Sequence, residues 1–297
     1  MTEESKGCVL RLFGAPQAAV KTAVGSVPPQ WNADVRWKSR GAETLVAVQA
    51  QSPAGLKKAA QTLRERFSAD LYGAGETTLP AAAVEALERH DKLLVCADAA
   101  AGALLEVRLE NVPGAEKVFD FGALSYAHAK TAAQIEKRAL ARLPKGCTDP
   151  VRTALARTQA ARRVVGADFA VGCAERADDH VLILSCKKGC WLRTVPAGEN
   201  PGLWLLDIIR RAACGKPQAE GTGFLPARKA ARQAEPQPAA RLVPKHRLRR
   251  AFGVLFVLAV LALAAAWILT GGDLAALPQQ LRSLFADGVP HSGAKLV

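Results

Sequence analysis

Cysteine and histidine are the side chains of this sequence that would first suggest chemistry. The chain has 7 Cys and 5 His among 297 residues. Cys186 and Cys190 do not have the C-x-x-C spacing of common zinc sites, and no second pair with suitable spacing accompanies them. We therefore predict two thiols beside a hairpin turn, with no metal site and no cofactor. The odd number of cysteines also favours reduced thiols over a disulfide scaffold.

Two other polar residues have structural explanations that compete with functional ones. His90 ends a segment with helical spacing, and a helix terminus is its simplest role. Asp98 follows a short apolar run that predicts a buried strand. An aspartate at this place commonly caps the next helix, and contact with a polar ligand is the alternative.

The positive charge is concentrated in one stretch of the chain. The sequence has 40 Lys and Arg against 27 Asp and Glu, a net charge of +13. Residues 216–250 hold nine Lys or Arg and two Glu, which gives +7 of this total. Aromatic residues are not interleaved with these cations, so nucleic-acid binding is not favoured. The Ala, Pro and Gln content of the stretch instead predicts a flexible basic tether.

An apolar segment follows the tether directly. Residues 251–272 are 22 residues without a charged side chain, too long an apolar run for an ordinary core helix. As a helix they would extend about 33 Å, enough to cross a hydrocarbon layer of about 30 Å. The basic residues just before this segment predict that the N-terminal part is cytoplasmic. Together with a start that lacks a secretory signal, this predicts a single-pass protein of the cell membrane with a short extracytoplasmic tail, residues 273–297.

Hydrophobic spacing predicts two folded units before the tether. Residues 1–75 are expected to form a small α+β unit, and residues 76–215 a unit in which strands and helices alternate. Such alternation implies a sheet covered on both faces. In the first unit we expect strands at 8–13, 35–38 and 44–49 and a helix at 53–67. In the second we expect helices at 79–90, 104–109, 148–165 and 202–214, strands at 92–97, 167–171, 181–186 and 191–195, and a strand, turn and helix over 118–142.

Short motifs in the second unit occur in a familiar order. Residues 71–79 read L-Y-G-A-G-E-T-T-L, residues 111–115 read N-V-P-G-A, and residues 121–126 read F-G-A-L-S-Y. Arg193 and Thr194 are followed by a basic helix. This series resembles the C-terminal domain of the CinA family of competence/damage-inducible proteins, and residues 8–75 resemble the KH-like middle domain of the same proteins.

The resemblance implies an α/β fold class. It predicts a KH-like α+β domain at 1–75 and a layered α/β domain like the CinA C-terminal domain at 76–215. The tether at 216–250, one transmembrane helix at 251–272 and the tail would follow. Residues 14–17 read G-A-P-Q, which is not the G-x-x-G loop with which KH domains bind RNA. RNA binding therefore does not follow from the resemblance.

The resemblance also implies a chemistry, because active relatives hydrolyse the carboxamide of nicotinamide mononucleotide. Their signature A-E-S-C-T-G-G supplies a serine nucleophile. Residues 97–103 here read A-D-A-A-A-G-A, so the serine position is Ala99. A methyl group cannot attack a carbonyl carbon, and loss of the nucleophile in a serine hydrolase costs about 10⁶ in turnover. We therefore expect no catalytic residue at this position.

Other parts of the implied site also differ from the family pattern. Lys130 follows Tyr126 by four residues, whereas the family places its lysine five after the tyrosine. The glycine-rich loop that would hold a phosphate corresponds to residues 171–179, which keep Gly172 but include Glu and two Asp. The residues that remain as candidates for a residual pocket are Asp98, Gly102, Tyr126, His128, Lys130 and Gly172.

These observations predict a membrane-anchored, catalytically inactive CinA-like protein with a binding or scaffolding role. The alternative is an amidohydrolase of nicotinamide mononucleotide that uses Tyr126, Lys130 or Asp98 in an altered arrangement. The lipid bilayer is the expected partner. Binding of a nucleotide in the residual pocket and formation of a homo-oligomer are left open by the sequence.

Overall fold

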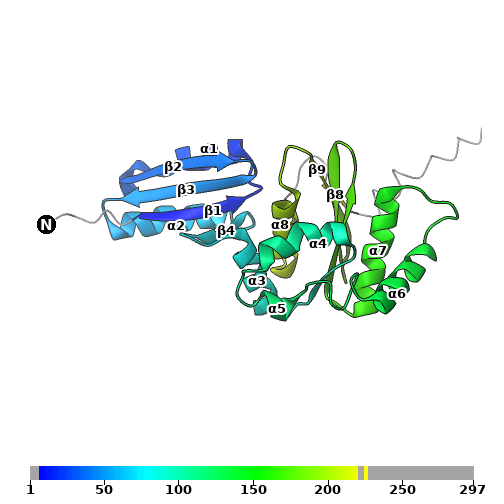
Figure 1. Ribbon diagram of the computed structural model, residues 1–297. Coiled ribbons are helices and arrows are strands. Elements are labelled where there is room, and N and C mark those ends of the chain that lie inside the picture. Colours follow the sequence, from blue (N-terminus) through cyan, green and yellow to red (C-terminus); the bar gives the residue numbers. More distant parts are fainter. Residues whose placement is uncertain (1–6, 220–223, 227–297) are drawn as a thin grey trace, which may run out of the picture. The chain divides into compact units, whose positions relative to one another are not determined.

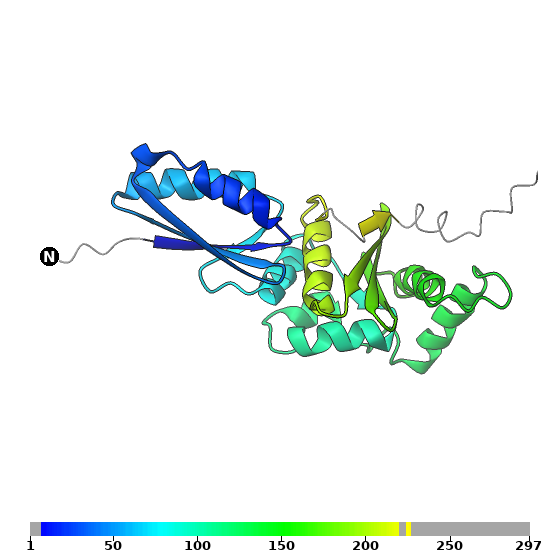
Figure 2. The same ribbon diagram turned by 90° about the horizontal axis from the view of Figure 1, so that it is seen from above.

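The computed structural model describes residues 7–219 and 224–226. The first part of the chain forms a four-stranded antiparallel sheet with strand order β2-β3-β1-β4. Its strands are β1 (Gly7–Phe13), β2 (Ala33–Arg40), β3 (Glu43–Ala50) and β4 (Leu71–Ala74). Helices α1 (Gln17–Gly25) and α2 (Pro53–Arg66) lie on one face of this sheet (Figure 2). A short 3-10 helix, η1 (Pro29–Trp31), precedes β2.

The core of this region comes from alternation in the strands and helical spacing in the helices. Leu10 and Leu12 of β1 pack with Val20 of α1 and Leu63 of α2. The hydroxyl of Ser52 accepts the N–H of Gly55 at 3.1 Å, which begins α2 as expected for a capping serine. The sequence did not predict α1 or β4. Helix α1 has no capping side chain and only two buried residues, so its local signal is weak.

The second part of the chain forms a mixed six-stranded sheet with strand order β10-β9-β8-β7-β5-β6. Figure 1 labels β8 and β9 of this sheet and the helices α3 to α8 around it. Strand β5 pairs in parallel with both β6 and β7, and the pairs from β7 to β10 are antiparallel. The strands are β5 (Leu94–Cys96), β6 (Phe119–Asp120), β7 (Phe169–Glu175), β8 (Asp179–Cys186), β9 (Gly189–Pro196) and β10 (Phe224–Pro226). The helices are α3 (Leu79–Arg89), α4 (Ala99–Leu109), α5 (Ala115–Val118), α6 (Ala129–Leu140), α7 (Pro150–Val165) and α8 (Pro201–Ala213).

Helices cover both faces of this second sheet. Leu94 and Cys96 of β5 pack in one apolar cluster with α3, α4 and α8, whereas Val95 packs in another with α6 and α7. Successive residues of a strand point to opposite faces, so one short apolar strand serves two cores. The mixed α/β class predicted from the sequence is confirmed. Helix α4 begins at Ala99, five residues earlier than predicted, because Asp98 caps it.

Part of the predicted tether belongs to the fold. Strand β10 pairs with β9 in antiparallel register, with Leu225 opposite Leu192. The side-chain amide of Gln218 donates to the carbonyl oxygen of Ile208 at 2.9 Å. The prediction of a flexible tether from residue 216 onward is therefore wrong for residues 216–219 and 224–226.

No helix within residues 7–219 and 224–226 combines the length and apolar character needed to cross a bilayer. The predicted transmembrane helix, residues 251–272, and the predicted tail, residues 273–297, lie outside the described residues. The anchor remains a prediction from the sequence.

Candidate functional site

Asp98 lies between the end of β5 and the start of α4. One carboxylate oxygen, Oδ1, accepts the N–H of Ala101 at 2.8 Å, and the other, Oδ2, accepts the N–H of Cys173 at 3.4 Å. Burial raises the pKa of Asp98, and these two donors offset part of that rise. Both oxygens therefore bind backbone groups of this domain. Asp98 acts as a helix cap that also joins α4 to β7.

Ala99 is the first residue of α4 and its side chain is exposed. Two cysteines near it could in principle replace a missing nucleophile. However, burial raises the pKa of Cys96 well above its ordinary value and that of Cys173 to about 12, and Asp98 adds to both shifts. Thiols with such pKa values stay protonated at neutral pH and are poor nucleophiles. Neither Cys96 nor Cys173 is therefore poised as a nucleophile.

Tyr126 and Gly102, two candidates for the residual pocket, lie in contact. The Tyr126 hydroxyl donates to Glu106, one turn further along α4. A Cβ atom at Gly102 would overlap that hydroxyl and would lie 2.7 Å from Cζ of Tyr126. Burial and the hydrogen bond to Glu106 raise the pKa of Tyr126. The phenol is therefore a protonated donor held against a bare helix surface and is not poised as a base.

His128 and Lys130 lie at the start of α6, on the surface. Nδ1 of His128 is 3.4 Å from the backbone nitrogen of Thr131 and 3.1 Å from its hydroxyl oxygen, so His128 caps this helix. The side chain of Lys130 is exposed. Within residues 7–219, no hydrogen bond or ion pair joins His128 or Lys130 to Asp98 or Tyr126. The predicted candidates therefore form two groups, one at α4 and one at the start of α6.

Gly172 lies inside β7 and pairs with Ile183 of β8. Its bare Cα lets Thr158 and Asp98 approach, since a Cβ there would overlap Thr158 Oγ1 and lie 3.2 Å from Asp98 Oδ2. The ladder with β8 continues to Glu175. Gly172 is therefore part of a regular strand, and its role is close packing at the carboxylate of Asp98.

The segment that would hold a phosphate ends in a tight hairpin. The N–H of Arg176 donates to the carbonyl oxygen of Asp179 at 2.9 Å. The guanidinium of Arg176 also makes two hydrogen bonds to the Asp179 carboxylate, at 2.6 and 2.7 Å. An open loop of backbone N–H groups is therefore not formed, and the exposed Glu175 and Asp178 add negative charge.

The two thiols of the next hairpin do not face each other. Cys190 pairs with Ser185, and Cys186 is the residue after Ser185 on the same strand. Directly opposed residues share a face and successive residues alternate, so Cys186 and Cys190 point to opposite faces of the sheet. Within the described residues, no group of three or more His, Cys, Asp or Glu side chains is arranged to hold a metal ion.

The most elaborate polar cluster of the described residues was missed by sequence reasoning. Asp207, Arg210 and Arg211 of α8 are almost fully buried. Oδ1 of Asp207 accepts from Arg210 at 2.6 Å, and Oδ2 accepts from Arg211 at 2.7 Å. Their spacing of three and four residues is typical of ion pairs along a helix. That spacing was visible in the sequence, but nothing local indicated burial.

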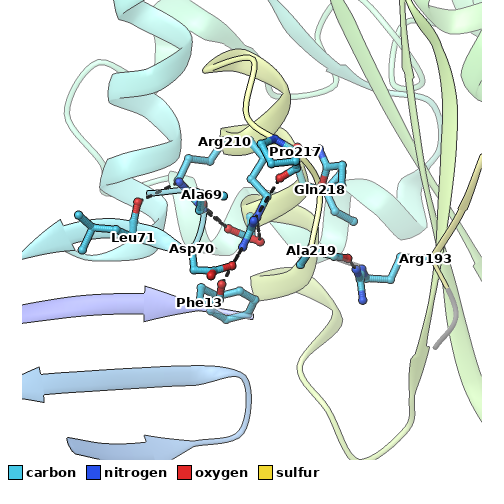
Figure 3. A network of polar contacts seen from close by, with 12 residues as sticks. Phe13, Ala69, Asp70, Leu71, Arg193, Arg210, Pro217, Gln218 and Ala219 are labelled. Carbon is cyan, nitrogen blue, oxygen red and sulfur yellow. Dashed lines mark hydrogen bonds and ion pairs between the residues drawn. The ribbon is translucent and has the colours of Figure 1, made fainter. Parts of the chain in front are cut away.

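The remaining donors of these two arginines reach residues of the first sheet and of the chain after α8 (Figure 3). Arg210 donates to the carbonyl oxygens of Ala69 and Leu71 at 2.9 and 3.2 Å. Arg211 donates at 2.8, 2.9 and 3.1 Å to three oxygens, those of the Phe13 carbonyl, the Asp70 carboxylate and the Pro217 carbonyl. We call Asp70, Asp207, Arg210 and Arg211 the arginine junction.

Arg193 of β9 is a third buried arginine, beside this junction. Its guanidinium carbon lies 4.3 Å from the ring centre of Trp204 and 5.3 Å from that of Phe224, and Nη2 donates to the carbonyl of Ala219. Burial lowers the pKa of Arg193. Cation–π contacts of this kind stabilise a desolvated guanidinium. They hold β10 and Ala219 against the sheet.

With this geometry in place, the chain can be compared with known proteins. Residues 76–180 match the model of the CinA C-terminal domain. The chain is 29% identical over 245 residues to a CinA-like protein of Desulfovibrio desulfuricans, covering 72% of this chain and 56% of that protein. It is 30% identical over 172 residues to a CinA-like protein of Anaeromyxobacter, covering 55% of this chain and 41% of that protein.

A third relative is named as a competence-damage inducible protein. A putative competence-damage inducible protein of Symbiobacterium thermophilum is 31% identical over 129 residues, 43% of this chain and 30% of that protein. The domain match and these relatives show that residues 76–180 are similar to the CinA C-terminal domain and that a larger part of the chain is similar to CinA-like proteins. The chain spans about half the length of the curated relatives that it matches, so the activities of whole relatives do not transfer to it directly.

Proposed function

We propose that this CinA-like protein is catalytically inactive and has a binding or scaffolding role. The observation that carries the proposal is the side chain at position 99, where the family resemblance expects a serine and this chain has alanine. The buried thiols of Cys96 and Cys173 have raised pKa values and offer no substitute nucleophile.

The arrangement around Ala99 supports the same conclusion. Catalysis needs polar groups that are held ready for the charge of the transition state. Here Asp98 is occupied by two backbone N–H groups, and Tyr126 donates to Glu106. Lys130 lies on the surface without an ion pair in the described part of the chain. Asp98 and Tyr126 are therefore engaged in other hydrogen bonds, and Lys130 is exposed.

We further propose that the protein is held at the cytoplasmic side of the cell membrane. Support comes from the 22 uncharged residues at 251–272 and from the cations that precede them. Cell fractionation tests this part. Recovery in the membrane fraction that survives a high-salt wash is expected. Recovery in the soluble fraction would contradict the anchor and leave the proposal about catalysis untouched.

Ammonia release from nicotinamide mononucleotide tests the catalytic part. The full chain in detergent should release ammonia at the rate of a blank, and Lys130→Ala should change nothing. Turnover that is abolished by Lys130→Ala would overturn the proposal in favour of the amidohydrolase. A thermal-shift measurement with the same nucleotide asks separately whether the pocket still binds it, since a ligand of the native state raises the melting temperature.

A further inference from the structure

Large apolar side chains are exposed around Ala99. Among the described residues, four large hydrophobic side chains are exposed, and three of them are on α4 or on the loop after β6. Val107 of α4 is 73% exposed, and Leu124 and Phe121 of the loop are 60% and 37% exposed. The fourth, Leu140, is 59% exposed at the end of α6. Clustered apolar exposure of this kind indicates an interaction surface more often than isolated apolar residues do.

These residues border one face of α4. At 3.6 residues per turn, Ala99, Ala103 and Val107 share a side of the helix, and all three are exposed. Tyr126 contacts Gly102 and Glu106 at the border of that side and holds the loop against the helix. We define the α4 face as the surface formed by Ala99, Ala103, Val107, Phe121 and Leu124.

The loop next to the α4 face has unsatisfied polar atoms beneath it. Asp120 is buried, and its Oδ1 accepts the N–H of Leu124 at 2.8 Å. Its Oδ2 and the hydroxyl of the fully buried Ser125 have no hydrogen-bond partner within the described residues. Buried polar atoms are normally paired, so Asp120 Oδ2 and the Ser125 hydroxyl are exceptions beneath this loop.

The charge around the α4 face is opposite to that of the chain as a whole. Residues 94–127 contain five Asp or Glu and two Lys or Arg. Asp120 is buried and both oxygens of Asp98 accept backbone N–H groups, so the carboxylates that can act at the surface are those of Glu106, Glu110 and Glu116. Neither cation is free, because Arg108 donates to Asn200 and to Leu104, and Lys117 pairs with Glu88. The next cation along the chain is the exposed Lys130. The surroundings of the face are therefore acidic as well as apolar.

We propose that the α4 face docks a basic amphipathic segment of a partner protein. The apolar side of such a segment would cover Val107 and Leu124, and its cations would meet Glu106 and Glu110. The inference rests on the proposed binding role, because it takes the surface around Ala99 as a docking site and not as a substrate entrance.

The same observations disfavour other occupants. A nucleotide or an anionic lipid headgroup would bring negative charge to an acidic surface. A second copy of this chain in a symmetric dimer would place the acidic face against itself, since such an interface uses the same patch on both subunits. A basic partner segment has neither difficulty.

A binding experiment on the full chain in detergent tests the proposal. The probe is a fluorescent peptide of leucine and lysine, about 15 residues long, with leucine at helical spacing. Anisotropy should show saturable binding that weakens as salt rises. Leu124→Lys should weaken binding by about tenfold or more because it adds a like charge at the centre of the surface. Leu140→Lys is the matched control, since Leu140 is equally exposed outside the face, and it should change affinity by less than about twofold.

Several results would overturn the proposal. Equal loss in the Leu124→Lys and Leu140→Lys variants would show a nonspecific effect of charge. Equal binding of a peptide with glutamate in place of lysine would remove the electrostatic argument. Sedimentation that shows self-association lost in Leu124→Lys would assign the face to a second copy. The ammonia assay on the same preparation stays independent, so a failure of the docking proposal and a failure of catalytic inactivity are distinguishable.

Discussion

The arginine junction and the surroundings of Ala99 both contain buried ionisable groups, but they use them differently. At the junction every guanidinium nitrogen of Arg210 and Arg211 has an acceptor, and Asp207 serves both arginines. Around Ala99, two buried polar atoms lack a partner and the position of the implied nucleophile is a methyl group. The junction joins separate chain segments through paired groups, whereas the α4 region leaves two buried polar atoms without a partner among the described residues.

The contrast indicates which polar groups of this protein stabilise the fold. A buried charge is tolerated only when it is paired and hydrogen-bonded, and removing one partner is costly. The junction meets that condition with oxygens from three separate parts of the chain. Its polar groups are therefore expected to matter for stability, and those near Ala99 are expected to matter much less.

The largest effect is expected at the centre of the junction. Asp207→Asn should lower the free energy of unfolding by about 3–5 kcal/mol, because the buried Arg210 loses its carboxylate partner and Arg211 keeps only Asp70. Urea denaturation followed by tryptophan fluorescence measures this. Asp34→Asn is the control, since the ion pair of Asp34 with Arg36 is exposed and should contribute about 0–1 kcal/mol. Similar losses of unfolding free energy in Asp207→Asn and Asp34→Asn would show that the buried ion pairs contribute no more than an exposed one.

A smaller loss is expected where Tyr126 packs on α4. Gly102→Ala would place a methyl group against the Tyr126 ring and displace it from Glu106, which should cost about 1–3 kcal/mol of stability. Gly25→Ala is the control, because no atom lies within 4 Å of a Cβ there, and it should be neutral or slightly stabilising. A tolerated Gly102→Ala with an unchanged Tyr126–Glu106 hydrogen bond would contradict the close packing.

The helix cap should give a still smaller effect with a defined pH dependence. Asp98→Ala should cost about 1 kcal/mol by removing the cap, whereas Asp98→Asn can still accept the N–H of Ala101. Burial raises the pKa of Asp98, so the stability that this carboxyl contributes is present at acidic pH and is lost as pH rises through its folded-state pKa. The stability of Asp98→Asn relative to the original chain should therefore increase from acidic to neutral pH. A change in the other direction would show that the hydrogen bonds to Asp98 outweigh its burial.

The smallest effect is expected at Ala99 itself. Ala99→Ser restores an oxygen at an exposed helix position, and stability should change by less than about 0.5 kcal/mol. Ammonia release from nicotinamide mononucleotide should stay at background, because the Tyr126 hydroxyl donates to Glu106 and its pKa is raised, so it is a poor base for the new hydroxyl. Activity restored by this one substitution would show that the rest of the site is intact, and the contrast with the junction would fail.

Much of the fold could be predicted because its signals are local. Alternation indicated β1, β3 and the hairpin of β8 and β9, and the caps Ser52 and Asp98 act within three residues of their own positions. Helix α1 and strand β4 were missed because each is short and owes its place to packing against β1 or α2. The tether was placed too early because β10 depends on pairing with β9 and on the aromatic contacts of Arg193.

The residues that the candidate site lacks could be predicted from the sequence, but the contacts between the residues that it has could not. The sequence alone shows the missing side-chain oxygen at Ala99 and the missing glycines of residues 171–179. Tyr126 and Gly102 were both candidates for a residual pocket, but the sequence predicted neither their contact nor the hydrogen bond of Tyr126 to Glu106. These depend on how the loop after β6 lies on α4.

The sequence by itself determined the alternation of apolar residues, the helix caps, the concentration of charge in residues 216–250 and the absence of a nucleophile at Ala99. Only the tertiary structure decided which charges are buried together. Arg211 and Phe13 are hydrogen-bonded across 198 residues of chain, and no local pattern encodes such a pairing. The reason is physical: a cap or a strand depends on neighbours a few residues away, whereas a buried guanidinium needs acceptors that only the completed fold brings within 3 Å or so.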